Sequence, residues 1–210
     1  MFDYFNYDYI ILDCDGVIFD SNRLKIIAYS NVLLGEPIEH VDAFIDYHKK
    51  NGGISRYHKF NYYFRVMKNS PNADKDIQDA LEKYSILIKK YLLECDYVPG
   101  VLKFIHQANS QGISIFVVSG SDEKELIDIF RQRGILDLFK RVYGSPVNKN
   151  DNTVNVLNRI KIPKKGIFFG DSKSDYDAAS KYALDFVFVS GVSDWCEGSK
   201  HSENIILNFD

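Results

Sequence analysis

Short apolar runs in two separated parts of the chain indicate the strands of a buried sheet. Three of them cover residues 9–12, 114–118 and 166–169, and a further strand is expected at 141–143. The runs lack the polar alternation of a half-exposed sheet, which is typical of strands buried on both faces of a parallel sheet. The pattern therefore predicts an α/β core, a doubly wound, Rossmann-like parallel sheet.

The segment between these two parts has a helical pattern. Four helices are expected, at residues 22–34, 39–51, 55–69 and 74–95. The longest places Ile77, Leu81, Tyr84, Ile88 and Tyr91 at spacings of four and three, an amphipathic stripe that indicates packing. We therefore expect an all-helical cap domain, residues 21–96, inserted into a core built from residues 1–20 and 97–210.

Composition and charge narrow the class of protein. Of 210 residues 45% are apolar, enough to fill a core, and the formal net charge of −3 offers no basic surface for nucleic acid. No apolar run approaches the roughly 20 residues that span a bilayer. The N-terminus has no signal-peptide pattern, and three widely spaced cysteines suggest free thiols. We expect a cytoplasmic monomer or weak homodimer without a nucleic-acid or membrane partner.

Polar side chains follow each predicted strand at the point where it ends. They are Asp13 and Asp15, Ser119, Lys149, and Asp171 with Asp175. Ligands of open α/β sheets bind at the carboxyl ends of the strands, and unpaired buried acids are too costly to serve as packing. Carboxylate oxygens together with a substrate phosphate suit Mg²⁺. The pattern predicts a metal-assisted phosphoryl-transfer site.

Each of these residues also has an ordinary structural interpretation. The alternatives are a helix N-cap for Asp171 or Ser172, a turn for Ser119, and a surface position for Asp175 and Lys149. Lys164 and Lys165 lie near enough in the sequence to compete with Lys149. Cys14, between the first two acids, is interpreted as a small buried residue. The coincidence of the whole set favours the site.

The motifs DCDGV, VVSG, GSPVNK and GDSKSD occur in this order and span nearly the whole chain. They resemble the four motifs of the haloacid dehalogenase superfamily, and the inserted helices resemble the cap of its phosphoglycolate phosphatase and β-phosphoglucomutase-like members. The resemblance implies that Asp13 is the nucleophile and forms an aspartyl-phosphate. It also implies that Asp15 is the general acid and base, protonating the leaving group and then activating water.

The resemblance further implies how metal and phosphate are held. Mg²⁺ would be bound by Asp13, the main-chain carbonyl of Asp15 and Asp171. Ser119, Gly120 and Lys149 would bind the phosphate. Asp175 would orient Lys149 or the waters of the metal.

The cap sequence KKNGGISRYHK places basic residues on both sides of a Gly-Gly turn before a helix start. Backbone N–H groups at such a start favour anions, and a guanidinium binds carboxylate or phosphate bidentately. By resemblance to capped family members, Arg56, Lys59 and Gly53 are expected to contact the leaving group. The alternative is an ordinary basic surface turn.

Within the family, the second acid of the first motif argues against dehalogenation and phosphonate cleavage, whose enzymes lack it. We expect a Mg²⁺-dependent phosphatase acting on a small soluble phosphomonoester such as a sugar, polyol or phosphoglycolate-like compound. The alternative is a phosphosugar mutase resembling β-phosphoglucomutase. A non-enzymatic module resembling a receiver domain is a remote alternative, since its phosphorylated aspartate follows a later strand.

Overall fold

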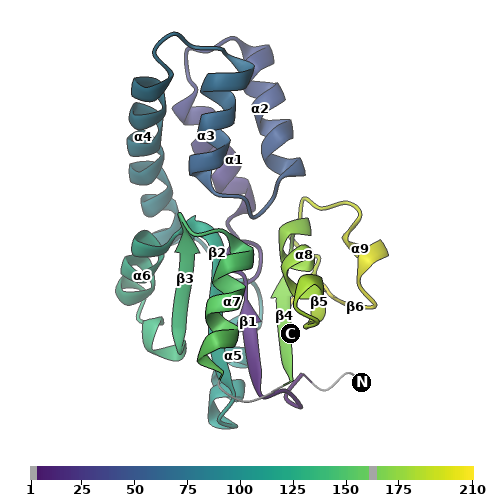
Figure 1. Ribbon diagram of the computed structural model, residues 1–210. Helices are drawn as coiled ribbons and strands as arrows, with labels where there is room; N and C mark the ends of the chain where they lie inside the picture. Colours follow the sequence, from purple (N-terminus) through teal and green to yellow (C-terminus); the bar gives the residue numbers. More distant parts are fainter. Residues whose placement is uncertain (1–3, 161–164) are drawn as a thin grey trace.

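The computed structural model describes residues 4–160 and 165–210. A bundle of helices stands over one end of a parallel sheet (Figure 1). The sheet contains β1 (Tyr9–Leu12), β2 (Ser114–Asp122), β3 (Arg141–Ser145), β4 (Gly166–Gly170), β5 (Asp185–Val189) and β6 (Asn204–Ile206). All neighbouring strands are parallel, in the order β3-β2-β1-β4-β5-β6. The predicted doubly wound fold is confirmed.

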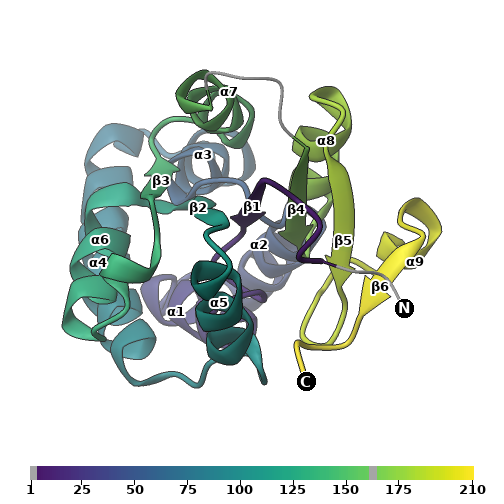
Figure 2. The ribbon, with the colours of Figure 1, turned by 90° about the horizontal axis from the view of Figure 1, so that it is seen from below.

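Helices cover both faces of the sheet, as Figure 2 shows from below. One face packs against α5 (Val101–Ser110) and α6 (Glu123–Gln132), the other against α7 (Lys149–Arg159) and α8 (Lys173–Lys181). Ile10 and Leu12 of β1 join the first core, and Tyr9 and Ile11 join the second. Burial on both faces explains the unbroken apolar pattern of β1, because neither set of alternating side chains meets water.

The strand order reverses at β1, so the chain leaves this strand toward β2 on one side and returns through β4 on the other. Leu12 of β1 lies opposite Phe169 of β4, and Asp13 N donates to the Phe169 carbonyl at 3.0 Å. The carboxyl ends of β1 and β4 are therefore adjacent at the switch point, where doubly wound sheets bind ligands.

The cap consists of α1 (Asn22–Val32), α2 (Ile38–Lys50), α3 (Arg56–Tyr62) and α4 (Ala73–Glu94). The single helix expected at 55–69 is instead α3 followed by a π-helical turn, η1 (Tyr63–Met67). The turn is closed by a bond from Lys68 N to the Tyr63 carbonyl. Phe60, Tyr63 and Phe64 have the i, i+3, i+4 spacing of one helical face and are all buried in the cap core, and the wider turn begins among them.

Two linkers join the cap to the core side by side. Phe19 and Tyr97 form a bridge, and Asp20 N donates to the Asp96 carbonyl at 3.0 Å. Arg133 of the core stacks on both rings, with its guanidinium carbon 4.7 Å from the Phe19 centroid and 4.0 Å from that of Tyr97. We therefore propose domain boundaries between residues 20 and 21 and between 96 and 97.

Three further details differ from the sequence prediction. β2 continues beyond residue 118 to Asp122, and Lys149, expected in a loop, is the first residue of α7. β5 and β6 extend the sheet beyond the strands that the sequence singled out. A short helix, α9 (Gly198–His201), precedes β6. No helix in residues 4–160 and 165–210 is long and apolar enough to cross a membrane.

Candidate active site

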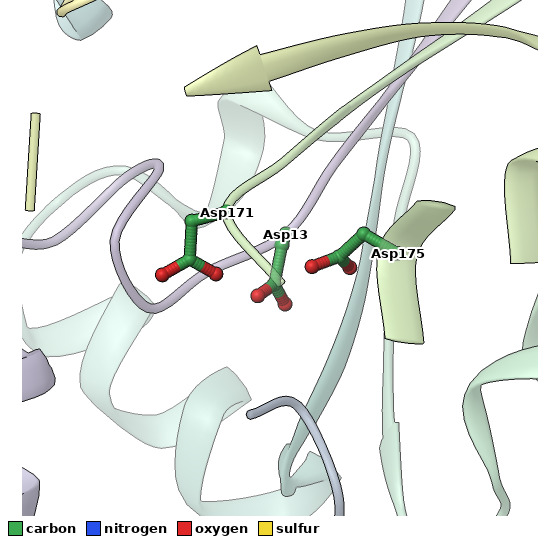
Figure 3. A group of neighbouring side chains, drawn as sticks. All are labelled: Asp13, Asp171 and Asp175. Atoms are coloured by element: carbon green, nitrogen blue, oxygen red, sulfur yellow. The ribbon is translucent and has the colours of Figure 1, made fainter. Parts of the chain in front are cut away.

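Three carboxylates meet beyond the ends of β1 and β4 (Figure 3). Asp13 follows β1, Asp171 follows β4, and Asp175 lies in the first turn of α8. Each offers an oxygen, and these three oxygens lie within 4.8 Å of one another. All three residues are buried, and Asp13 is only 2% exposed. The adjacency of the two strand ends, which the sheet topology dictates, brings together acids far apart in the sequence.

Like charges so close together disfavour their own ionisation. Burial, with Asp175 nearby, raises the pKa of Asp13 to about 7 in the protein alone. Burial and Asp13 also raise the pKa of Asp171 well above its usual range. Asp13 Oδ1 is buried and accepts no hydrogen bond from the described residues. An all-oxygen donor set with an unsatisfied oxygen and excess negative charge fits a hard divalent cation such as Mg²⁺.

Lys149 supplies a positive charge next to this cluster. Its Nζ lies 3.3 Å from Asp13 Oδ1 and donates to Asp175 Oδ1. Burial lowers the pKa of Lys149, but Asp13 and Asp175 outweigh it and raise the pKa above the usual value. Of the competing lysines, Lys165 is exposed at the other end of β4 and Lys164 lies outside the described residues.

Asp175 is fully buried rather than on the surface, and it has two partners of different kinds. Its Oδ1 accepts a hydrogen bond from Lys149 Nζ. Its Oδ2 accepts hydrogen bonds from Ser172 N at 3.1 Å and from Ser172 Oγ at 2.5 Å. The bond from the Ser172 backbone is one half of the capping box that begins α8, with Ser172 as the N-cap. The N-cap alternative therefore holds for Ser172. Asp175 connects the start of α8 to Lys149.

Asp15 has a different environment from Asp13. Its Oδ1 accepts from Ser21 Oγ at 2.7 Å, and its Oδ2 accepts from Ser121 Oγ at 2.9 Å and from Lys25 Nζ. Burial acts to raise the pKa of Asp15, but Lys25 and the two hydroxyls outweigh burial and lower it. The Asp15 side chain is not a member of the three-acid cluster. The expected contact of its main-chain carbonyl with a metal stays a prediction.

The end of β2 provides hydroxyl and backbone groups. Ser119 is fully buried, and its Oγ accepts a hydrogen bond from Ser121 N at 3.1 Å. Gly120 and Ser121 line a cavity of about 440 Å³ between cap and core, together with Asp13 and Asp15. Of the three predicted phosphate ligands, Gly120 is among the residues that line this cavity, whereas Ser119 and Lys149 are buried behind its lining. Phosphate binding by Ser119, Gly120 and Lys149 stays a prediction.

The Gly-Gly turn of the cap descends onto the core at this cavity. Gly53 has φ of +74°, and a Cβ built on it would lie 2.0 Å from Ser174 Oγ and 2.9 Å from Lys149 Nζ. A Cβ built on Gly120 would lie 2.1 Å from the Gly53 carbonyl oxygen. Two glycines therefore permit the backbones of cap and core to approach closely beside the predicted phosphate site.

Arg56 and Lys59 both lie on the buried face of α3 but have different partners. The Arg56 guanidinium, expected to be available for a substrate anion, forms a two-pronged ion pair with Glu125 of α6, at 2.7 and 2.6 Å. Arg56 therefore joins cap to core. Lys59 Nζ lies 2.7 Å from His48 Nδ1 of α2. Both cationic side chains line the cavity.

The comparison with known families agrees with this arrangement. Residues 10–189 match the family model described as haloacid dehalogenase-like hydrolase. The chain belongs to this family. It is accordingly an enzyme of the hydrolase class, and the resemblance seen in the four sequence motifs is confirmed.

Individual relatives of this hydrolase are distant. A phosphorylated carbohydrates phosphatase from Thermotoga maritima is 23% identical over 187 residues, 85% of this chain and 83% of the relative. CbbY from Rhodobacter sphaeroides, solved in complex with phosphate, aligns with a TM-score of 0.76 and 16% identity over 97% of this chain and 95% of its own. β-Phosphoglucomutase from Clostridium difficile gives 0.72 and 17% over 97% and 92%. The two solved structures share the fold.

The site of this hydrolase includes residues that sequence reasoning missed. Ser21 and Lys25 hold Asp15, while Asn22 Nδ2 donates to Asp171 Oδ2 at 2.6 Å. All three lie at or just before the first turn of α1, directly after the acid pair. Polar residues one turn apart at this position were the available signal, because a helix leaving the end of β1 begins beside the acids.

Proposed function

We propose that this hydrolase is a Mg²⁺-dependent phosphomonoesterase that acts on a small phosphorylated carbohydrate or similar metabolite through an aspartyl-phosphate. The observation that carries the proposal is the placement of Asp13 at the switch point, between two further acids and beside Lys149. A relative that acts on phosphorylated carbohydrates supports the substrate class. A cavity of about 440 Å³ suits a compact molecule.

Asp13 is the proposed nucleophile. Its free oxygen attacks phosphorus as the bond from phosphorus to the leaving oxygen breaks, which divides one difficult displacement into two easier ones. Asp13, Asp171 and the main-chain carbonyl of Asp15 are the proposed ligands of Mg²⁺. When bound, the ion neutralises charge on the carboxylates and on the phosphate. Lys149, fixed by Asp175, offsets the remaining negative charge of the phosphoryl group.

Asp15 is the proposed general acid and base. It gives a proton to the leaving alkoxide and then takes one from the water that hydrolyses the aspartyl-phosphate, which releases phosphate and restores Asp13. Lys25 favours the ionised form, which the second step needs. An approaching substrate dianion favours the protonated form, which the first step needs, because like charge raises the pKa of a carboxyl group. Ser21 and Ser121 fix the carboxylate in the cavity.

A phosphate-release screen over small sugar, polyol and carboxylated phosphomonoesters, run with Mg²⁺, tests the proposal. We expect turnover of at least one ester that is lost in excess chelator and in Asp13→Asn. Asp177→Asn, which changes an exposed acid two residues beyond Asp175, is the control expected to keep full activity. Turnover that survives chelation or survives Asp13→Asn contradicts the mechanism. Interconversion of sugar phosphates that depends on an added sugar bisphosphate indicates the mutase alternative instead.

A further inference from the structure

We propose that Lys59, held by His48, binds a second anionic group of the substrate and thereby selects esters that carry one. This inference rests on the proposed function and deepens it, since it names the substrate class as phosphomonoesters with a carboxylate or a second phosphate on the leaving group. The observation is a buried cation that lines the cavity of the acids without a counter-charge of its own.

The position of Lys59 places its amine over the reaction site rather than in solvent. Its side chain lies on the inner face of α3, one turn after Arg56, and the residue is 2% exposed. It lines the same cavity as Asp13 and Asp15. Its Nζ lies 5.8 Å from the centroid of the Tyr29 ring, on the cap side of this cavity.

Lys59 differs from the other cations around the site in being buried without an ion pair. Lys49 and Lys50 also line the cavity without an ion pair to any described residue, but both are exposed to water. Lys25 pairs with Asp15, Arg56 with Glu125, and Lys149 with Asp13 and Asp175. In the described part of the chain no carboxylate lies within 4.0 Å of the Lys59 amine. A buried charge without a partner is costly, and a protein that keeps one has a strong affinity for an anion there.

Burial and the neighbouring cations make the charged form of Lys59 unfavourable until an anion is present. Burial first, and then the Lys25 and Lys149 amines, lower the pKa of Lys59 well below its usual value, although Asp15 and Asp171 act to raise it. An anion arriving from the substrate supplies the missing counter-charge and restores the charged form. The inference itself stands on the geometry, since Lys59 lines the cavity and His48 is the one hydrogen-bond partner of its amine among the described residues.

His48 orients the amine. Burial and the adjacent Lys59 lower the pKa of His48 well below its usual value, so the imidazole is neutral. In this form its Nδ1 accepts one of the three N–H groups of Lys59, at 2.7 Å. The remaining two are available to a ligand. A lysine ammonium is a compact point charge, so carboxylate and phosphate oxygens suit it equally.

Arg56 is the obvious competitor for this role, but its terminal nitrogens are already held. Both donate to Glu125, and Nε alone has no partner among the described residues. A guanidinium fixed to the core in this way closes the cap over any substrate. Arg56→Met is therefore a matched control. It removes a cation from the same face of the same helix, but one that binds Glu125 of the core rather than the substrate.

Two pairs of esters isolate the second charge. Glycerol 3-phosphate and 3-phosphoglycerate differ by a carboxylate, and glucose 1-phosphate and glucose 1,6-bisphosphate differ by a phosphate. We expect wild type to prefer the doubly anionic member of at least one pair, which also tells carboxylate from phosphate. Lys59→Met is expected to lower kcat/KM for that member by about 10- to 150-fold, the range of a hydrogen bond to a charged group, with little change for its partner. Arg56→Met is expected to affect both members alike.

An equilibrium measurement keeps the inference separate from the proposed function. Titration of both members of each pair into Asp13→Asn, with and without Lys59→Met, measures binding without turnover. We expect Lys59→Met to remove the preference for the second anion, while its melting temperature stays equal to wild type or rises. The absence of phosphate release from every ester refutes the proposed function alone. Equal affinity of wild-type Lys59 protein for both members of each pair, or equal losses on both in Lys59→Met, overturns the role of Lys59.

Discussion

Replacing Gly120 with alanine tests whether the cap must seat closely on the core. The added Cβ would lie 2.1 Å from the carbonyl oxygen of Gly53, whereas real Cβ contacts essentially never fall below 3.0 Å. The neighbour is backbone, so no side chain can rotate away. The Gly-Gly turn must therefore withdraw by about 1 Å, and the cavity beside Lys149 opens by the same amount.

The expected loss of activity follows from the displacement of the Gly-Gly turn beside the site. A displacement of about 1 Å at a site that depends on orientation costs on the order of 10²-fold in rate. The clash exists only while cap and core are in contact, so withdrawal of the turn relieves it without unfolding either part. Alanine also suits a strand at least as well as glycine does. We expect kcat/KM to fall on the order of 10²-fold with a melting temperature close to wild type.

The assay compares turnover of the best ester from the screen with thermal unfolding of the same samples. Gly35→Ala is the matched control, because Gly35 has φ of +96° and nothing within 4 Å of a built Cβ. This control is expected to lose about 1–2 kcal/mol of unfolding free energy through backbone strain and to keep its turnover. Full activity of Gly120→Ala refutes the need for close seating. A parallel loss of activity and stability shows instead that the clash damages the fold.

Two further predictions concern Asp15 and its partner. Asp15→Asn is expected to lower kcat by about 10²- to 10⁴-fold, the usual value of general acid–base catalysis, and least for esters with good leaving groups; a uniform loss across leaving groups argues against that role. Lys25→Met is expected to cost about 3–5 kcal/mol in the free energy of unfolding, since Asp15 is left buried without its cation. The double variant is expected to recover most of this loss, and urea denaturation of the three proteins measures it. A cost below about 1 kcal/mol for Lys25→Met contradicts the burial argument.

The sequence could predict the acids at the sheet because the apolar strands are visible in the sequence and parallel strands place their carboxyl ends side by side. Asp13 and Asp171 directly follow apolar strands, and parallel strands present their carboxyl ends at one edge. No knowledge of distant packing is needed to expect these acids to meet. The cap helices could be predicted for a similar reason, since the apolar face of the longest repeats within one continuous segment and glycine or proline ends the first two.

The details of the cap depended on contacts that no local pattern encodes. The π-helical turn η1 interrupts the single helix expected at 55–69, and no apolar spacing in the sequence marks where it begins. Tyr84 and Ile88 were interpreted as packing residues, yet they also line the cavity. The face of a helix can be read from its period, but what covers that face cannot.

The sequence by itself thus determined which acids lie together at the sheet, Asp13, Asp171 and Asp175, because type, spacing and strand position already restrict them to one edge. Only the tertiary structure decided how the cationic residues are used. Arg56 and Lys59 are one turn apart on the same helix, yet Glu125 neutralises the first, while the second has no carboxylate partner among the described residues and contacts His48 instead. The physical reason is that the partner of a buried charge comes from another element, 69 residues away for Arg56, and docking of cap on core sets that pairing.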